Sequence, residues 1–208
     1  VDLKKDQSYF LYRLNQDQLS RTLFPLGGYT KEQVRQMARE RGLTVADKAD
    51  SQDFYAGDYT DLLEQAPRVG KIVHVNGQVL GTHQGFWNYT IGQRKGLGIG
   101  WTEPLFVIDL DPEANVVVVG GADHSPVTGC LARQSVWNAA PLQGQKRVLA
   151  RYRSSGRLVN AVIESAGESG DIRVLFDTPQ RSVSRGQSVV FYENDVVLGG
   201  GIIAPLTV

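Results

Sequence analysis

Sulfur-containing residues are scarce in this sequence, whose 208 residues include one cysteine, Cys130, and one methionine, Met37. A single cysteine excludes an internal disulfide framework and any zinc site built from several cysteines. A chain without disulfides fits a reducing compartment, so we expect a cytoplasmic protein. No apolar run approaches the roughly 20 residues that span a bilayer, and no signal peptide opens the chain, so we expect no membrane partner. Because the first residue is Val1, we expect a piece of a longer protein.

The sequence also lacks a net charge, because its 22 basic residues balance 22 acidic ones. The balance is uneven along the chain, since the stretches 65–102 and 124–163 contain no Asp or Glu. Their basic residues are Arg68, Lys71, Arg94, Lys95, Arg133, Lys146, Arg147, Arg151, Arg153 and Arg157. Basic stretches without acid indicate a surface that faces a polyanion. Chance clustering on solvated faces explains the same pattern equally well.

The first third of the chain carries the signals of helix ends. Thr30 and Gln33 form a capping box ahead of an apolar stripe, and Gly42 stands where a C-cap belongs. Asn15 has the position of the N-cap of a shorter helix. The segment 57–67, GDYTDLLEQAP, predicts a further short helix that ends before its proline.

Strand signals replace helix signals after Pro67. The pair Asn76-Gly77 between two apolar runs predicts a hairpin with a type I′ turn, and residues 111–115 predict the turn of a second hairpin. From about Asp123, short alternating segments separated by Gly, Asn, Asp and Pro predict a small antiparallel barrel. The fold class is therefore α+β with several domains, and the pattern changes near residues 56 and 122.

The glycine-rich stretch 82–100, THQGFWNYTIGQRKGLGIG, has the composition of a ligand-binding turn. Glycines allow the backbone to approach a ligand closely. Arg94 and Lys95 can bind phosphate oxygens, and the rings of Trp87 or Tyr89 can stack on a nucleobase. The alternative is a glycine-rich bend whose two cations face water.

A second candidate is the segment RYRSSGR, in which Arg151 and Arg153 lie two positions apart on an expected strand. Both guanidiniums then share one face, while Tyr152 points to the other. Such a face can follow a phosphate backbone. The alternative is the charged outer face of a barrel.

Residues suited to catalysis are few. The three histidines, His74, His83 and His124, show no metal-ligand spacing, and no hydrolytic triad is present. Cys130 begins a strand among small or apolar residues, which indicates a buried structural thiol. We therefore predict no metal ligand and no catalytic residue in this chain.

Several stretches together resemble the tRNA-specific 2-thiouridylase family, formerly described as tRNA (5-methylaminomethyl-2-thiouridylate)-methyltransferases. They are, in order, KDQSYFLYRL, DSQD, GKIVHVNGQVLGTHQG, YTIGQRKGLGIG, EPLFVIDLDPEANVVVVG, ARYRSS, RGQSVVFY and LGGGII. The resemblance covers essentially the whole chain. It implies an enzyme that thiolates the wobble uridine of tRNA, in which ATP adenylates the uridine C2 oxygen and a cysteine persulfide delivers sulfur.

The resemblance also implies an architecture. Residues 1–56 are expected to be the helical tail of an ATP-pyrophosphatase α/β domain, and residues 57–122 a small mixed central domain. Residues 123–208 are expected to form a six-stranded antiparallel barrel like that of elongation factors. ATP and Mg are expected on the part of the ATP-pyrophosphatase domain upstream of this chain, because the family's Ser-Gly-Gly-x-Asp-Ser loop does not occur here.

The family's tRNA contacts transfer to matching positions of this chain. The expected tRNA-binding residues are Lys5, Asp6, Gln7, Gln93, Arg94, Lys95, Arg151, Tyr152 and Gln187. The expected partner is the anticodon arm of tRNA, together with a possible sulfur-carrier protein.

One segment departs from the family pattern, which usually reads Asp-Ser-(Gln/Thr)-(Asp/Gly)-Ile-Cys-Phe and provides the persulfide cysteine. Here residues 50–56 read DSQDFYA, so that Phe54 and Tyr55 stand near the cysteine position. Either sulfur arrives by another route, as free sulfide or through an upstream cluster, or this homologue does not thiolate. Two other functions stay open: a non-catalytic tRNA- or ribosome-binding module, and a barrel whose basic faces bind an acidic protein.

Overall fold

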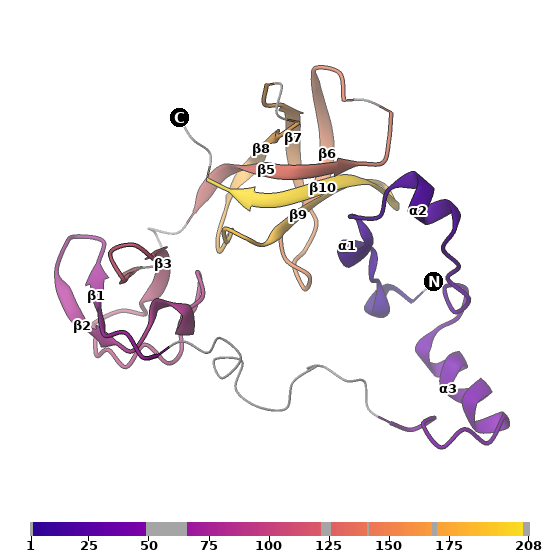
Figure 1. The fold of residues 1–208 in the computed structure, drawn as a ribbon, viewed down its shortest axis with the longest axis horizontal. Coiled ribbons are helices and arrows are strands. Elements are labelled where there is room, and N and C mark those ends of the chain that lie inside the picture. The colour runs from indigo at the N-terminus through magenta and orange to yellow at the C-terminus, as the bar shows by residue number, and fades with distance from the viewer. Residues whose placement is uncertain (1, 49–65, 122–125, 141, 168–169, 206–208) are drawn as a thin grey trace.

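The computed structural model describes residues 2–48, 66–121, 126–140, 142–167 and 170–205. Within them, an N-terminal helical segment is followed by a four-stranded sheet and a closed six-stranded barrel. Figure 1 shows the sheet on one side of the barrel and the N-terminal segment on the other. The predicted fold class, α+β with a six-stranded antiparallel barrel, is confirmed.

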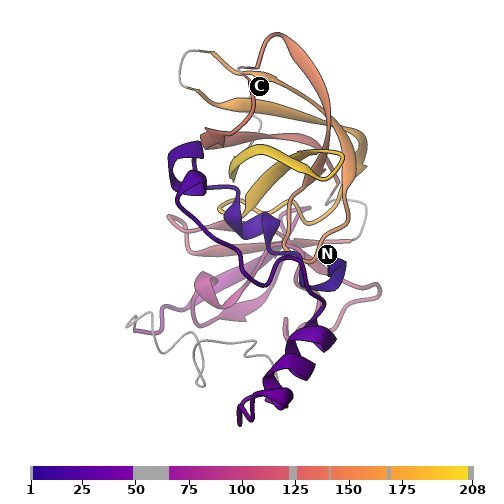
Figure 2. The same ribbon diagram turned by 90° about the vertical axis from the view of Figure 1, so that its right-hand side faces the viewer.

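The N-terminal helices begin and end where their capping residues predict. They are η1 (Leu3–Lys5), α1 (Ser8–Leu11), α2 (Gln16–Ser20) and α3 (Lys31–Glu40). Asn15 and Thr30 each close a capping box at the start of α2 and α3. Gly42 follows α3 with a φ of +65°, a conformation that glycine adopts without strain. Figure 2 shows α3 extending away from the barrel. The helix expected over 57–67 lies largely outside the described residues.

No helix of the described residues is both long and apolar enough to cross a membrane.

The central sheet has the strand order β2-β1-β4-β3. Its strands are β1 (Gly70–His74), β2 (Val79–His83), β3 (Phe106–Asp111) and β4 (Val116–Gly120), and η3 (Phe86–Asn88) follows β2. β1 and β4 pair in parallel, whereas the two hairpins are antiparallel. Ile72, Val107, Val117 and Val119 form the centre of a buried core on this sheet, and each is at most 1% exposed. The glycine-rich stretch folds over this core through Leu97.

The hairpin between β1 and β2 is confirmed, but the predicted turn type is wrong. His74 O accepts a hydrogen bond from Gly77 N at 2.8 Å, and His74 N donates to Gln78 O at 2.8 Å. Gly77 has a φ of +91°, whereas the φ of Asn76 is not positive. This is a three-residue loop with one left-handed glycine. It needs a single positive-φ residue, where a type I′ turn needs two.

The barrel closes in the order β10-β5-β8-β7-β6-β9. Its strands are β5 (Val127–Trp137), β6 (Gln145–Arg151), β7 (Val159–Ser165), β8 (Ile172–Gln180), β9 (Ser188–Glu193) and β10 (Val196–Ala204). Each was predicted as a short alternating segment, and the inward positions form one core around Ile163, Val174 and Phe191. Closure leaves no free sheet edge.

Strand direction places three parts of the barrel at the same end. β6 ends at Arg151 and β8 ends at Gln180, and both run antiparallel to the strand between them, β7. The connections 152–158 and 181–187 therefore leave the barrel together. The start of β5 lies there too, because Val127 pairs with Gln180. We call this the loop end of the barrel.

Candidate nucleic-acid interface

The N-terminal segment is fixed to the barrel by two tyrosines. Tyr9 and Tyr12 are 5% and 3% exposed and pack on Val190 and Tyr192 of β9. The Tyr9 hydroxyl donates to Ser188 O at 2.8 Å, and the Tyr12 hydroxyl lies 3.0 Å from Ser188 Oγ. Buried aromatic area with satisfied hydroxyl groups is typical of a stable interface. The two tyrosine hydroxyls are thereby held at the start of β9, at the loop end, whereas Gln16 reaches Asn138 O beyond the other end of β5.

An ion pair joins the same segment to the end of β6. Arg151 Nη1 lies 3.1 Å from Asp6 Oδ2, and the guanidinium lies 5.4 Å from the centre of the Tyr192 ring. Burial disfavours the charged form of Asp6, but hydrogen bonds from Ser8 and the contact with Arg151 outweigh it and lower the pKa of this carboxyl group. Two of the predicted tRNA-binding residues are thus brought together, and they bind each other.

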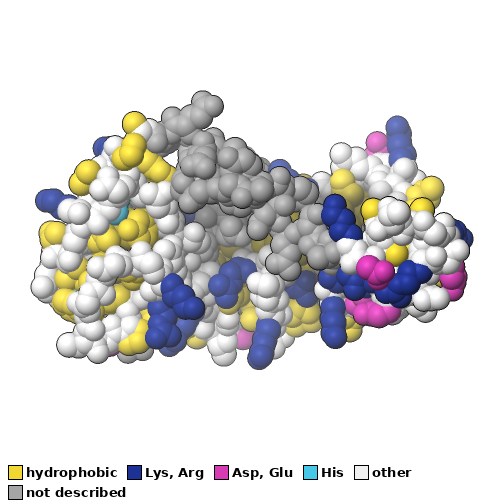
Figure 3. Space-filling view, turned by 90° about the horizontal axis from the view of Figure 1, so that it is seen from below, with side chains coloured by type: hydrophobic (Ala, Val, Ile, Leu, Met, Phe, Trp, Pro, Cys, Tyr) yellow, Lys and Arg dark blue, Asp and Glu magenta, His cyan; other side chains and the backbone are white. Residues whose placement is uncertain are grey.

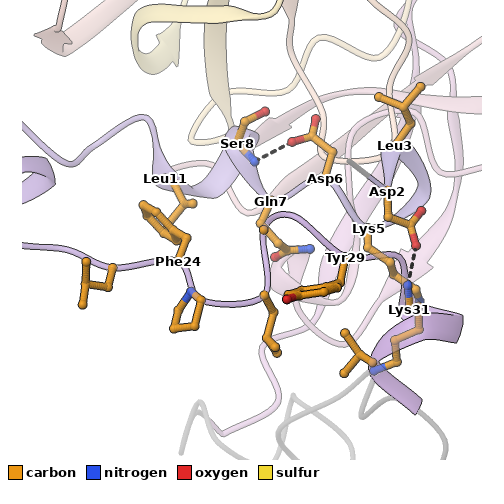
Figure 4. Close-up of a pocket in the computed structure, with 15 residues that line it drawn as sticks. Asp2, Leu3, Lys5, Asp6, Gln7, Ser8, Leu11, Phe24, Tyr29 and Lys31 are labelled. Carbon is orange, nitrogen blue, oxygen red and sulfur yellow. Dashed lines mark hydrogen bonds between the residues drawn. The ribbon is translucent and has the colours of Figure 1, made fainter. Parts of the chain in front are cut away.

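Lys5 and Gln7 are the residues before and after Asp6 in the chain. Both line a pocket of about 630 Å³ formed by the N-terminal segment. In Figure 4, Gln7 points toward Tyr29, whereas the carboxylate of Asp6 turns away toward Ser8 N, at 2.9 Å. Gln7 is exposed and its side chain does not cap α1.

Tyr152 and Gln187, the other predicted barrel contacts, differ in exposure. Tyr152 is 9% exposed and belongs to the barrel core, and its hydroxyl donates to Gln180 Oε1 at 3.1 Å. Burial raises the pKa of this tyrosine. Gln187 is exposed and lines a pocket of about 310 Å³ between the sheet and the barrel, with Tyr89 and Arg185. Tyr152 therefore holds the end of β6 in place, and Gln187 presents a free amide.

Within the glycine-rich stretch, Gln93 ties the turn together. Its Oε1 accepts from Thr90 N at 2.9 Å, its Nε2 donates to Lys95 O at 2.9 Å, and its backbone carbonyl accepts from Val107 N at 2.9 Å. With these bonds made, the side chains of Arg94 and Lys95 are exposed. Gln93 shapes the turn, and its two neighbours are presented to solvent.

The aromatic rings next to this turn are already packed. Tyr89 stands edge-on to His83, with ring centres 5.6 Å apart, and it packs on the core of the sheet. Trp87 lies against Gly85, where an added Cβ would overlap its ring. Both rings are partly exposed, so each is fixed on one side and partly open to solvent.

The glycine-rich turn lies directly beside the loop end of the barrel. Gly92 has a φ of +85° and faces Ser182 so closely that a Cβ would overlap the serine side chain. Ser184 Oγ donates to Ile91 O at 3.4 Å, and an ion pair between Arg185 and Asp109 spans the same junction at 3.6 Å. A close contact and a hydrogen bond thus connect the turn to residues 181–187, and the ion pair connects β3 to them.

Most of the basic residues in the stretch 124–163 form ion pairs with acidic residues from other parts of the chain. Acids from other segments pair with four of them: Arg133 with Asp171, Lys146 with Glu193, Arg147 with Asp177 and Arg151 with Asp6. A stretch without acid in the sequence therefore does not guarantee a basic surface. The exposed Arg153 and Arg157 have no ion pair among the described residues.

Cys130, the one thiol of the sequence, belongs to the buried core of the barrel. Cys130 is 2% exposed, and burial raises the pKa of its thiol to about 12, as expected for a structural cysteine. Among the residues that the structure describes, no group of three or more His, Cys, Asp or Glu side chains could hold a metal ion. Phe54 and Tyr55, near the family's cysteine position, lie outside the described residues.

The predicted site residues come from four stretches, 5–7, 93–95, 151–152 and 187, and their contacts and strand positions place all four around the loop end. In Figure 3, Lys and Arg side chains stand along the lower half of one face, from the sheet across the barrel to the N-terminal segment. The sequence patterns did not single out Arg181, which follows the end of β8 as Arg153 follows the end of β6. Only the strand order of the barrel brings both residues to the loop end.

Three family models match consecutive parts of the chain. A tRNA methyl transferase HUP domain matches residues 1–55, a tRNA methyl transferase PRC-barrel domain matches 61–121, and an aminomethyltransferase β-barrel domain matches 127–203. Their order defines a class of multi-domain proteins in which a β-barrel follows HUP and PRC-barrel units.

Curated relatives define the family within this class. Proteins described as tRNA-specific 2-thiouridylase MnmA include one from Endomicrobium trichonymphae, 48% identical over 98% of this chain and 57% of its own length. Others are from Microcystis aeruginosa, 45% identical over 100% and 60%, and from Synechocystis, 45% identical over 99% and 59%. The chain belongs to the tRNA-specific 2-thiouridylase family, as its motifs indicated. It spans about three fifths of the length of these relatives.

Proposed function

We propose that this chain is the tRNA-binding part of an enzyme that makes 2-thiouridine at the wobble position of tRNA by ATP-dependent sulfur transfer. Its family supports the reaction class. One structural observation supports the binding role: the four stretches 5–7, 93–95, 151–152 and 187 lie around the loop end of the barrel. A folded RNA can touch all four at once only if they lie together.

The predicted tRNA-binding residues form two groups, one that positions the segments of the site and one that is exposed to contact RNA. Asp6, Arg151, Tyr152 and Gln93 hold the segments in position through the bonds described above. A second group is exposed to solvent or lines an open pocket: Lys5, Gln7, Arg94, Lys95 and Gln187. Cationic groups bind phosphate oxygens, and amide groups hydrogen-bond to sugars and bases. The ligand that this mixture fits is the anticodon arm of tRNA in the cytoplasm.

The chemistry of sulfur transfer is assigned to other residues. The sequence contains no Ser-Gly-Gly-x-Asp-Ser loop for ATP, so we propose that ATP and Mg bind to a part of the nucleotide-binding domain that this chain does not include. We propose the domain division 1–56, 57–122 and 123–208, with only the first belonging to the nucleotide-binding domain. By itself the chain binds tRNA without thiolating it.

Titration of tRNA binding against salt tests the binding role. Each phosphate contact contributes a slope of roughly −0.7 to −0.9 to the plot of log affinity against log salt. Exposed cations from three segments predict a steep slope that corresponds to several contacts. A flat salt response, or no binding of tRNA to the purified chain, would contradict the proposal.

A non-catalytic tRNA- or ribosome-binding module is the second candidate, favoured by residues 50–56, which lack the family's persulfide cysteine. Mass spectrometry of tRNA nucleosides from a strain lacking the gene separates the two. Loss of 2-thiouridine supports the enzyme, whereas unchanged nucleosides support the module. An acidic sulfur-carrier protein remains a proposed partner, and its competition with tRNA for the chain would show whether both use the basic face.

A further inference from the structure

Arg153 and Arg181 both lie at the loop end of the barrel, just beyond the ends of β6 and β8. Tyr152 precedes the first and Gln180 precedes the second, and these two residues are hydrogen-bonded at 3.1 Å. β6 and β8 have both ended at this point, so each arginine is the first exposed side chain beyond its strand. The Tyr152–Gln180 bond therefore fixes the separation between the two guanidinium-bearing segments.

The same edge continues onto the glycine-rich turn. Ser182, next to Arg181, contacts Gly92, and Arg94 and Lys95 follow Gly92 by two and three positions. The internal bonds of Gln93 fix the shape of this turn, and the side chains of Arg94 and Lys95 are exposed. Four exposed cations, Arg94, Lys95, Arg153 and Arg181, therefore lie where the central sheet meets the loop end of the barrel, and we call them the basic rim.

These four cations differ from those on the barrel wall. None of the four has an ion pair within the part of the chain that the structure describes. By contrast, Arg133 and Lys146, toward the opposite end of the barrel, are paired with Asp171 and Glu193. Clustered cations without counter-charges repel one another, so their arrangement favours a bound polyanion.

We propose that this basic rim binds the sugar–phosphate backbone of the RNA, independently of its sequence. The inference rests on the proposed tRNA-binding function and adds Arg153 and Arg181 to it. Guanidinium groups form paired hydrogen bonds with phosphate oxygens. The rim then sets the register of the RNA, while Gln187 and Gln7 are placed to contact bases or sugars.

The composition of the rim favours RNA over an acidic protein. Protein interfaces depend on buried apolar and aromatic anchors, whereas nucleic-acid interfaces are polar and strongly basic. Many of the most exposed large apolar side chains in the described residues lie on the N-terminal segment, including Leu3, Leu23 and Val45. On the connections 152–158 and 181–187, which carry the rim, the exposed large apolar side chain is Leu158, at 39%. The rim therefore has the polar, basic composition of a nucleic-acid interface.

The salt dependence of tRNA binding by a double variant tests the rim. In the chain carrying Arg153→Gln and Arg181→Gln, the log–log slope should become less steep by about 1.4–1.8, because two phosphate contacts are lost. Binding of an unrelated RNA hairpin of equal length should weaken to the same extent. The control carries Arg133→Gln and Lys146→Gln, which remove the same charge from the other end of the barrel and should leave the slope nearly unchanged.

The outcomes of this experiment distinguish failure of the rim proposal from failure of the proposed function. If both double variants shift the slope equally, the rim is overturned and the proposed function stands, because the wild-type chain still binds with a steep slope. If the wild-type chain does not bind tRNA, the proposed function and the rim both fail. If the rim variant weakens binding to polyglutamate and not to tRNA, an acidic protein is the ligand and the proposal is overturned. All four substituted side chains lie on the surface, and unfolding curves followed by circular dichroism verify that the variants fold.

Discussion

Asp6 and Arg151 form an ion pair at 3.1 Å although 145 positions separate them in the sequence. The pair is mostly buried, since the side chains are 32% and 19% exposed. It joins the N-terminal segment to the last residue of β6. Both residues are predicted to contact tRNA, and in the structure their ion pair also holds the segment that carries Lys5 and Gln7.

Removal of this ion pair should lower the stability of the chain. Asp6→Ala leaves the largely buried Arg151 without its partner, and we expect a loss of about 1–2 kcal/mol in the free energy of unfolding. Chemical denaturation measures this loss. The matched control is Arg21→Ala, whose partner Asp17 is exposed, and it should cost less than about 0.5 kcal/mol. Equal losses in the two variants would show that Asp6 has no special role.

The contribution of Asp6 should depend on pH in one direction. Its pKa is lower in the folded chain than the ordinary value of 3.8. A lowered pKa stabilises the fold above 3.8, and this contribution disappears as pH falls through the folded pKa. The stability difference between the wild-type chain and Asp6→Asn should therefore be constant at neutral pH and shrink as pH falls below about 4. A difference that grows with acidity would contradict the assignment.

The contact between Tyr12 and the barrel should require glycine at position 200. A Cβ on Gly200 would lie 2.5 Å from Val189 O and 2.8 Å from the Tyr12 ring. Gly200→Ala should therefore lower stability by about 1–3 kcal/mol, as overpacked sites do. Gly100→Ala is the control, because a Cβ there meets nothing within 4 Å. Calorimetry or denaturant titration of both variants checks the difference.

Cys130 should not react as a nucleophile in the folded chain. Its pKa of about 12 leaves about 1 thiol in 10,000 deprotonated at pH 8, and the barrel core surrounds it. Iodoacetamide should label the thiol slowly in the native state and rapidly after unfolding. Fast labelling of the native chain would reopen the possibility that Cys130 carries sulfur.

Local signals in the sequence predicted most of the elements correctly. Capping boxes at Asn15 and Thr30, the Asn76-Gly77 turn and the alternating barrel strands each depend on residues a few positions apart. The type of the Asn76-Gly77 turn was wrong because backbone angles at a single residue are not determined by its identity.

Contacts between distant segments could not be predicted in the same way. Pairing of Arg133 with Asp171, and of Arg147 with Asp177 across β7, depends on the order of the strands in the closed barrel. The position of Arg181 at the same end of the barrel as Arg153 depends on the same strand order. The family's motifs identified Arg151 and Tyr152 as important, but only the fold shows that both also have structural partners.

Hydrogen–deuterium exchange of the chain with and without tRNA tests most directly whether one end of the barrel binds RNA. We expect slower exchange upon binding at three places: residues 92–98, 152–158 and 181–187. Amides of residues 166–167 and 170–171, at the opposite end, should be unaffected. Protection confined to that opposite end, or spread evenly over the barrel wall, would contradict the account.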